Sequence, residues 1–134
     1  MPQASALFRT VARSDRLGFG SGDSLDGRKV VEFLGFKKPE LAKVAGVAPA
    51  SVRFDQKMPG EVRARIEEIA NVIELVAQFF DGDAAKTALW FKTPNPMLGN
   101  ISPRDMIRYG RYDRLRRFVV EALDENAAEA QGVV

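Results

Sequence analysis

The chain of 134 residues is 46% hydrophobic and 28% charged, a balance typical of one globular domain, or of two very small ones sharing a core, and not of a disordered chain. It contains no cysteine and no histidine, which excludes disulfides, thiolate nucleophiles, cysteine-ligated zinc, and histidine as general base or metal ligand. The net charge of +2 neither requires nor excludes a nucleic-acid partner.

These absences argue against an enzyme and against a metal or other cofactor. No apolar run approaches the roughly 20 residues that span a bilayer, and no signal-peptide pattern is found. We therefore expect a cytoplasmic protein without a membrane partner. Its acidic residues fall mostly at helical spacing among Arg and Lys, as Glu67 and Glu68 do beside Arg63 and Arg65, and are expected to form helix-surface ion pairs.

The first 26 residues are expected to be a flexible N-terminal segment. Leu7, Phe8 and Val11 make one amphipathic turn that is too short to be stable alone, and the stretch from Arg13 to Gly27 is rich in Gly, Ser and Asp. The run Gly18–Gly22 superficially resembles a phosphate-binding loop. No Gly-Lys-Ser/Thr follows it and no strand pattern precedes it, so we interpret it as a linker.

Residues 27–58 predict short helices in a helix-turn-helix arrangement. The first is closed by Gly35, the second covers residues 41–45 and is stopped by Gly46, and the third is expected from Pro49 to about Gln56. Small residues where two helices touch and a glycine at the turn are typical of this motif.

The third helix would then offer Ser51, Arg53 and Lys57 to DNA. Asp55 departs from the pattern, because an apolar residue is expected there and a carboxylate repels phosphates. A helix-turn-helix region kept for packing alone therefore stands beside the DNA-binding interpretation.

Residues 59–134 predict a long central helix followed by shorter ones. After Pro59-Gly60, an apolar stripe at spacings of three and four is formed by Val62, Ile66, Ile69, Ile73, Val76 and Phe80. Asp81-Gly82-Asp83 is expected to end this helix and to cap a helix over residues 84–91, and Ser102-Pro103 to begin another. Tyr112, Leu115, Val119, Ala122 and Leu123 give a final helix its apolar face. Alternation with period two is absent, so the predicted fold is all-α.

The segment from Trp90 to Tyr112 holds the only tryptophan and three of the seven prolines. It predicts a rigid helix–loop–helix corner. We expect Trp90, Phe91 and Pro94 to lie in the core, with Leu98, Ile101 and Met106 packed beneath them. Exposed residues of the corner, Asn95 among them, would be available to a partner.

Charge is unevenly distributed over the C-terminal region. Residues 104–117 hold six arginines and two aspartates, whereas Glu121, Asp124, Glu125 and Glu129 follow with no basic residue. A basic helix followed by an acidic tail suits a partner of complementary charge, although a solvated terminal helix with frayed ends is the plainer interpretation. Because Arg and Tyr are common interface anchors, we expect Arg111, Tyr112 and Arg116 to contact a partner.

Two sets of residues carry a resemblance to known proteins. The first set is Leu41-Ala42, Ala45-Gly46-Val47 and Ser51-Val52. The second and more specific set is Leu89-Trp90-Phe91, Thr93-Pro94-Asn95, Leu98, Pro103 and Gly110-Arg111-Tyr112. Through these two sets, residues 27–123 resemble the MbcA/ParS/Xre antitoxin family, in which an Xre-like helix-turn-helix region precedes a toxin-binding domain.

The resemblance implies an antitoxin that neutralises a co-encoded toxin, most often of the RES type, which consumes NAD. The C-terminal region would reach toward the NAD pocket of the toxin, and family members commonly form homodimers and in several cases repress their own promoter. Toxin-binding residues implied in this way and by the charge pattern are Asn95, Arg111, Tyr112, Arg116, Glu121, Asp124 and Glu125. Two other classes stay open: a helix-turn-helix transcriptional regulator without a toxin, and a structural or adaptor module.

Overall fold

The computed structural model describes residues 16–20, 24–55 and 57–130, with side chains up to Asn126. Within this part of the chain the secondary structure is helical, apart from one isolated antiparallel bridge between Asn95 and Ile101, so the all-α prediction is confirmed. In chain order the elements are α2 (Gly27–Leu34), α3 (Lys38–Ala45), the 3-10 turn η2 (Pro49–Ser51), α4 (Gly60–Phe79), α5 (Ala84–Lys92), the 3-10 turn η3 (Pro96–Leu98), α6 (Pro103–Arg108) and α7 (Tyr112–Ala130).

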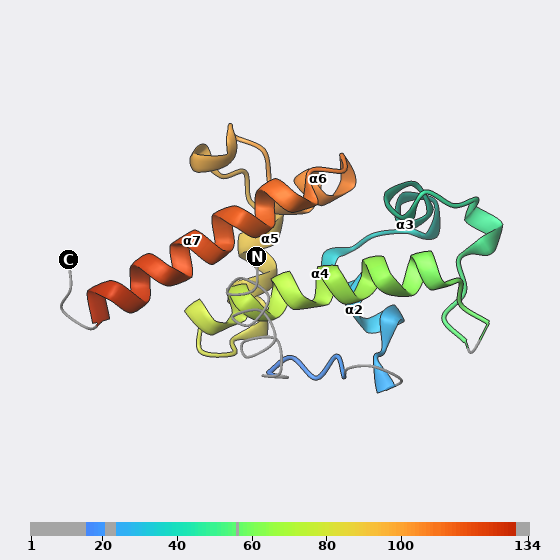
Figure 1. Ribbon diagram of the computed structural model, residues 1–134, viewed down its shortest axis with the longest axis horizontal. Helices are drawn as coiled ribbons and strands as arrows, with labels where there is room; N and C mark the ends of the chain where they lie inside the picture. The colour runs from blue at the N-terminus through green and yellow to red at the C-terminus, as the bar shows by residue number, and fades with distance from the viewer. Residues whose placement is uncertain (1–15, 21–23, 56, 131–134) are drawn as a thin grey trace.

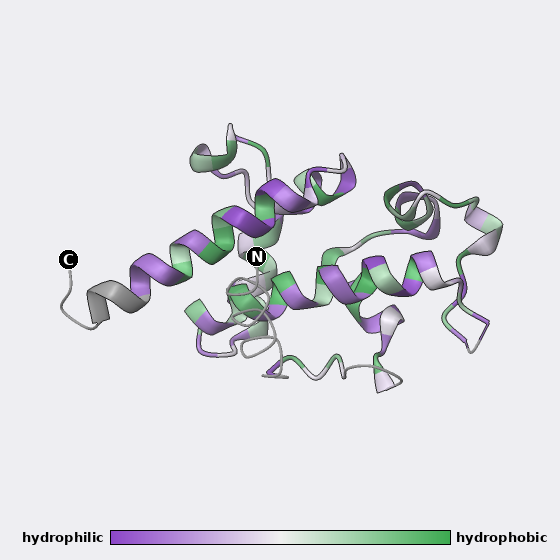
Figure 2. Ribbon diagram, viewed as in Figure 1, coloured by the Kyte–Doolittle hydropathy of each residue, from purple (hydrophilic) through white to green (hydrophobic). Residues whose placement is uncertain are grey.

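Helix α4 is the central element of the fold, as its long apolar stripe predicts. It runs through the middle of the molecule, and α2, α3, α5 and α7 all pack against it (Figure 1). From Val72 to Ala77 every side chain of α4 is buried, because the helix is covered on several sides at this level. Helix α7 extends past the end of α4 and carries recurring hydrophilic bands along its length (Figure 2).

The helix boundaries follow the capping signals of the sequence. The carboxylates of Asp26 and Asp83 and the hydroxyl of Ser102 accept backbone N–H groups of the first turns of α2, α5 and α6. Gly35 and Gly46 adopt left-handed conformations, with φ of 72° and 73°, and end α2 and α3. The predicted helix ends at these positions are confirmed.

The prediction of a third helix in residues 27–58, from Pro49 to about Gln56, is wrong. Only the turn η2 forms, and after it Val52 is extended, with φ of −77° and ψ of 112°. The carboxylate of Asp55 accepts the N–H of Lys57, a local bond that competes with helix formation. Met58 is followed by Pro59, which disfavours helical geometry in the residue before it. Gln56 itself lies outside the described residues.

The prediction that the chain around Gly18 is a flexible linker is wrong for residues 16–20. Phe19 is 2% exposed and packs edge-on against Phe33 of α2, with ring centroids 5.7 Å apart. The buried carboxylate of Glu74, in the middle of α4, accepts the backbone N–H groups of Arg16 and Leu17 at 3.0 and 3.1 Å. A buried charge requires such partners, so this stretch belongs to the core. Residues 1–15 and 21–23 of the same segment lie outside the described part.

Candidate functional site

The corner between α5 and α6 is held by local hydrogen bonds. The Asn95 side chain accepts the N–H of Met97, and the backbone of Asn95 pairs with Ile101 across the bridge. Leu98 is buried beneath the turn, whereas Met97 at its tip is 75% exposed. Pro94 is exposed, which corrects the expectation that it lies in the core. The reason is that α5 ends at Lys92 and Thr93 is extended, so Pro94 lies in the loop before η3.

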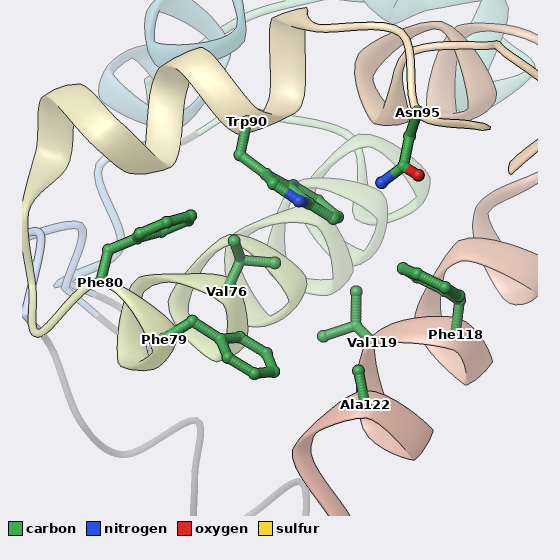
Figure 3. Close-up of a pocket in the computed structure, with 8 residues that line it drawn as sticks. All are labelled: Val76, Phe79, Phe80, Trp90, Asn95, Phe118, Val119 and Ala122. Carbon is green, nitrogen blue, oxygen red and sulfur yellow. The ribbon is translucent and has the colours of Figure 1, made fainter. Parts of the chain in front are cut away.

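An apolar pocket of about 350 Å³ lies between α4, α5 and α7. In Figure 3 Val76 and Phe79 of α4, with Phe80 just after it, face Phe118, Val119 and Ala122 of α7. Trp90 of α5 and Asn95 lie at the upper edge. Trp90 is half-buried and Phe79 is 39% exposed, so the pocket opens to solvent. The sequence prediction missed Phe79 and Phe118, although both sit at the margin of an apolar stripe, where a helix face meets solvent.

Tyr112 is a core residue and not the exposed anchor that the sequence analysis expected. Its side chain is 5% exposed, and its hydroxyl donates a hydrogen bond of 2.8 Å to the backbone carbonyl of Glu68 on α4. Burial raises the pKa of the phenol above its ordinary value of 10.0. Tyr112 therefore fixes the start of α7 against α4, and it positions the charged residues that follow.

The six arginines between residues 104 and 117 divide into two groups. Arg104 and Arg108 are structural: the first donates to the carbonyl of Leu34 at the end of α2, and the second pairs with Glu40 of α3 and with Asp105. The contact of Arg104 with Leu34 is favourable, because it puts a cation at the C-terminus of α2. It was not predicted, because the two residues are 70 positions apart in sequence. Arg111, Arg114 and Arg117 are exposed, and Arg116 is half-buried.

The outer face of α7 changes sign along its length. Arg114, Arg117, Glu121, Asp124 and Glu125 are all exposed, and their spacings of three and four place them on one side of the helix. We call these five residues the outer face. The residues from Glu121 onward were expected to form a tail, but they continue α7, which runs to Ala130. The side chains of residues 127–130, including Glu129, lie outside the description.

The acidic end of this face works against the helix that carries it. Asp124 and Glu125 lie three and four residues after Glu121, so the three carboxylates repel one another. The last turn of α7, which follows them, holds no basic residue. A cluster that costs stability in the isolated chain is relieved when a cationic surface binds to it.

The residues expected to contact DNA lie near one another in the chain but not on a recognition helix. Ser51 is half-buried in η2, and Arg53 and Lys57 are exposed in the loop that follows. Arg53 binds Asp55 at 2.7 Å, and this hydrogen bond holds the pKa of Asp55 below its ordinary value of 3.8. Asp55 is exposed, so no buried apolar contact is missing at this position.

Among the residues that the structure describes, no group of three or more His, Cys, Asp or Glu side chains could hold a metal ion. A search of the same residues finds no helix with the length and apolar character needed to cross a membrane.

Comparison with known proteins assigns a class to the region just described. Residues 74–124, which hold the pocket and most of the outer face, match the family described as the antitoxin Xre/MbcA/ParS C-terminal toxin-binding domain. Over this domain, the chain is similar to antitoxins of the Xre/MbcA/ParS family.

Among its relatives is the mycobacterial cidal antitoxin MbcA of Mycobacterium bovis and of Mycobacterium tuberculosis. Each of these sequences is 29% identical over 89 residues, which cover 63% of this chain and 77% of the relative. A chain in the crystal structure of the M. tuberculosis MbcT–MbcA toxin–antitoxin complex is 22% identical, with a TM-score of 0.46, over 81% of this chain and 94% of that one.

Proposed function

We propose that this chain is an antitoxin, which neutralises a co-encoded toxin by docking the outer face of α7 onto it. The observation that carries the proposal is the acidic end of that face, where Glu121, Asp124 and Glu125 are exposed and mutually repulsive. Arrangements that cost stability in the free protein are expected at functional positions. The match of residues 74–124 to a family model described as a toxin-binding domain supports a toxin as the partner.

The proposed toxin is of the RES type and consumes NAD, as the family resemblance implies. A pocket that binds a negatively charged dinucleotide carries positive charge, so the carboxylates of α7 can enter it by charge complementarity. Arg111, Arg114 and Arg117 lie nearer the start of the helix and would contact acidic residues around that pocket. The chain itself is proposed to have no catalytic activity, to act in the cytoplasm and to form a homodimer.

Co-expression with the toxin encoded beside this chain tests the proposal. The wild-type antitoxin should restore growth and co-purify with the toxin. Reversing the charge of Glu121, Asp124 and Glu125 to Lys should abolish rescue while leaving the antitoxin folded, because all three side chains are exposed. Glu32→Lys, at an exposed position of α2, is the control. Full rescue by the triple variant would remove α7 from the interface, and failure of the wild-type chain to bind the toxin would remove the function.

Operator binding by a dimer is a second proposed function. Residues 27–57 hold seven basic residues and three acidic ones, so this region is cationic although the whole chain is nearly neutral. Without a long recognition helix, binding would rest mainly on phosphate contacts from residues such as Arg53 and Lys57 and would weaken steeply with salt. A gel shift with the promoter of the operon, with and without toxin, tests this function. The absence of a shift at low salt in both cases would contradict it.

A further inference from the structure

We propose that the apolar pocket between α4, α5 and α7 is the binding site for residues 1–15 of the same chain, which enter it as an amphipathic helix. This goes beyond toxin neutralisation, because it assigns an occupant to the pocket and a task to the N-terminal segment. The segment would lie beside the acidic end of α7 and share it with the toxin.

The pocket has the composition of a groove for an apolar helix face. Seven of its eight lining residues are apolar, and Asn95 is the exception. Figure 3 shows that the apolar side chains converge from α4 and α7 on one space. Open apolar surface of this kind is unfavourable in water, and grooves lined in this way receive the apolar side of a helix.

The described chain begins close to this pocket. The backbone N–H of Arg16 donates to Glu74 of α4, and a side chain at Gly82 would contact the aliphatic part of Arg16 at 3.6 Å. Gly82 follows Phe80, which lines the pocket, by two residues, so their Cα atoms are at most about 7.6 Å apart. Residues 12–15 can span up to about 14 Å. Residues 1–11 can therefore reach the pocket without displacing Arg16.

The sequence of the segment fits the groove. Ala4, Leu7, Phe8 and Val11 have the spacing i, i+3, i+4, i+7 and would form one apolar side of a helix. Arg9 and Arg13 fall on the opposite side. A helix this short is not stable alone, and burial of its apolar side in a groove supplies the missing stabilisation.

Charge complementarity favours this occupant. Ala122 lines the pocket, and Glu121, Asp124 and Glu125 flank it on α7. Arg9 and Arg13, on the solvent side of the bound helix, would bring positive charge near these carboxylates. The tether of a few residues gives the segment an effective concentration on the order of mM, which favours it over a second copy at lower protein concentrations.

Trp90 reports on the pocket, because it is the only tryptophan and lines it. The experiment compares Trp90 emission and acrylamide quenching in the full chain and in the Leu7→Ser/Phe8→Ser variant. We expect a red shift and stronger quenching in the variant, with the same circular dichroism over the helical region. Ala6→Ser, on the opposite side of the segment, is the matched control and should change neither signal.

A synthetic peptide of residues 1–15 should reverse the shift of the Leu7→Ser/Phe8→Ser variant at concentrations on the order of mM. Adding Phe79→Ser, inside the pocket, should prevent this reversal. Adding Leu89→Ser, at a position of α5 that is 67% exposed and outside the pocket, should not.

Identical emission and quenching in the full chain and the variant would overturn the proposal. A Trp90 signal of the full chain that changes on dilution would identify a second copy as the occupant, and protection that arises only with toxin would identify the toxin. Both of these outcomes would also overturn it. Because these measurements use the free chain, they can fail while toxin neutralisation stands.

Discussion

Tyr112→Phe separates a core role of this residue from a role in partner binding. The substitution removes one hydroxyl that is buried and donates to the carbonyl of Glu68 at 2.8 Å. Because Glu68 lies within α4, its carbonyl keeps a helical partner, so the loss should be near the average for a hydrogen bond, about 1 kcal/mol. Such a loss lowers the melting temperature of a domain of this size by about 4 °C.

Urea denaturation, followed by Trp90 fluorescence, measures this free energy, and toxin inhibition by the same variant should be unchanged. Tyr112→Ala should cost about 3–5 kcal/mol, since it also empties the space of the ring between α4 and α7. The reasoning is refuted if Tyr112→Ala keeps the stability of the wild type and loses toxin binding, because the side chain would then act at a surface.

The raised pKa of Tyr112 adds a pH dependence with a defined sign. A folded-state pKa above the unfolded value of 10.0 means that the neutral phenol is favoured in the folded protein. The stability that it contributes is complete below pH 10 and is lost as the pH rises through the folded-state pKa. Tyr112→Phe should lose less stability than the wild type above pH 10, which urea midpoints measured at alkaline pH can test.

Three further substitutions test particular contacts of the structure. Ser102→Ala removes the cap of α6 and should lower the free energy of unfolding by about 1 kcal/mol in urea titrations, with no loss expected if the cap is not formed. Arg53→Ala should raise the pKa of Asp55 back toward 3.8 in an NMR titration, and an unmoved midpoint would contradict the ion pair. Glu74→Ala should accelerate amide exchange at Leu17, because that N–H loses its acceptor, whereas unchanged exchange would show that another group holds it.

Local signals in the sequence predicted most of the fold. Ser102, Asp83, Gly35 and Gly46 act through bonds to residues at most a few positions away, so their roles are visible in the sequence. The long stripe of α4 was predicted for a similar reason, since helical periodicity repeats every few residues. The failure after Ser51 has a local cause too, because the turn at Asp55 and the effect of Pro59 on Met58 both disfavour a helix there.

Contacts between distant residues were not predictable in this way. Glu74 holds backbone amides 57 and 58 residues away, and this contact orders a stretch whose composition suggests a linker. Tyr112 was expected at the surface because its residue type is common at interfaces, although its position on the apolar face of α7 indicated burial. The change from basic to acidic residues along α7 could be predicted from the sequence, whereas the continuation of the helix past Glu121 could not.

If the toxin consumes NAD as proposed, neutralisation by the acidic end of α7 is tested most directly by measuring its NAD consumption in a titration with this chain. The full chain is compared with a chain that ends at Leu123, which lacks Asp124 and Glu125 but keeps every residue of the described core. The account predicts that the shortened chain stays folded and needs at least about tenfold more protein for half-inhibition, a loss of about 1.4 kcal/mol. Equal inhibition by the two folded chains would contradict it.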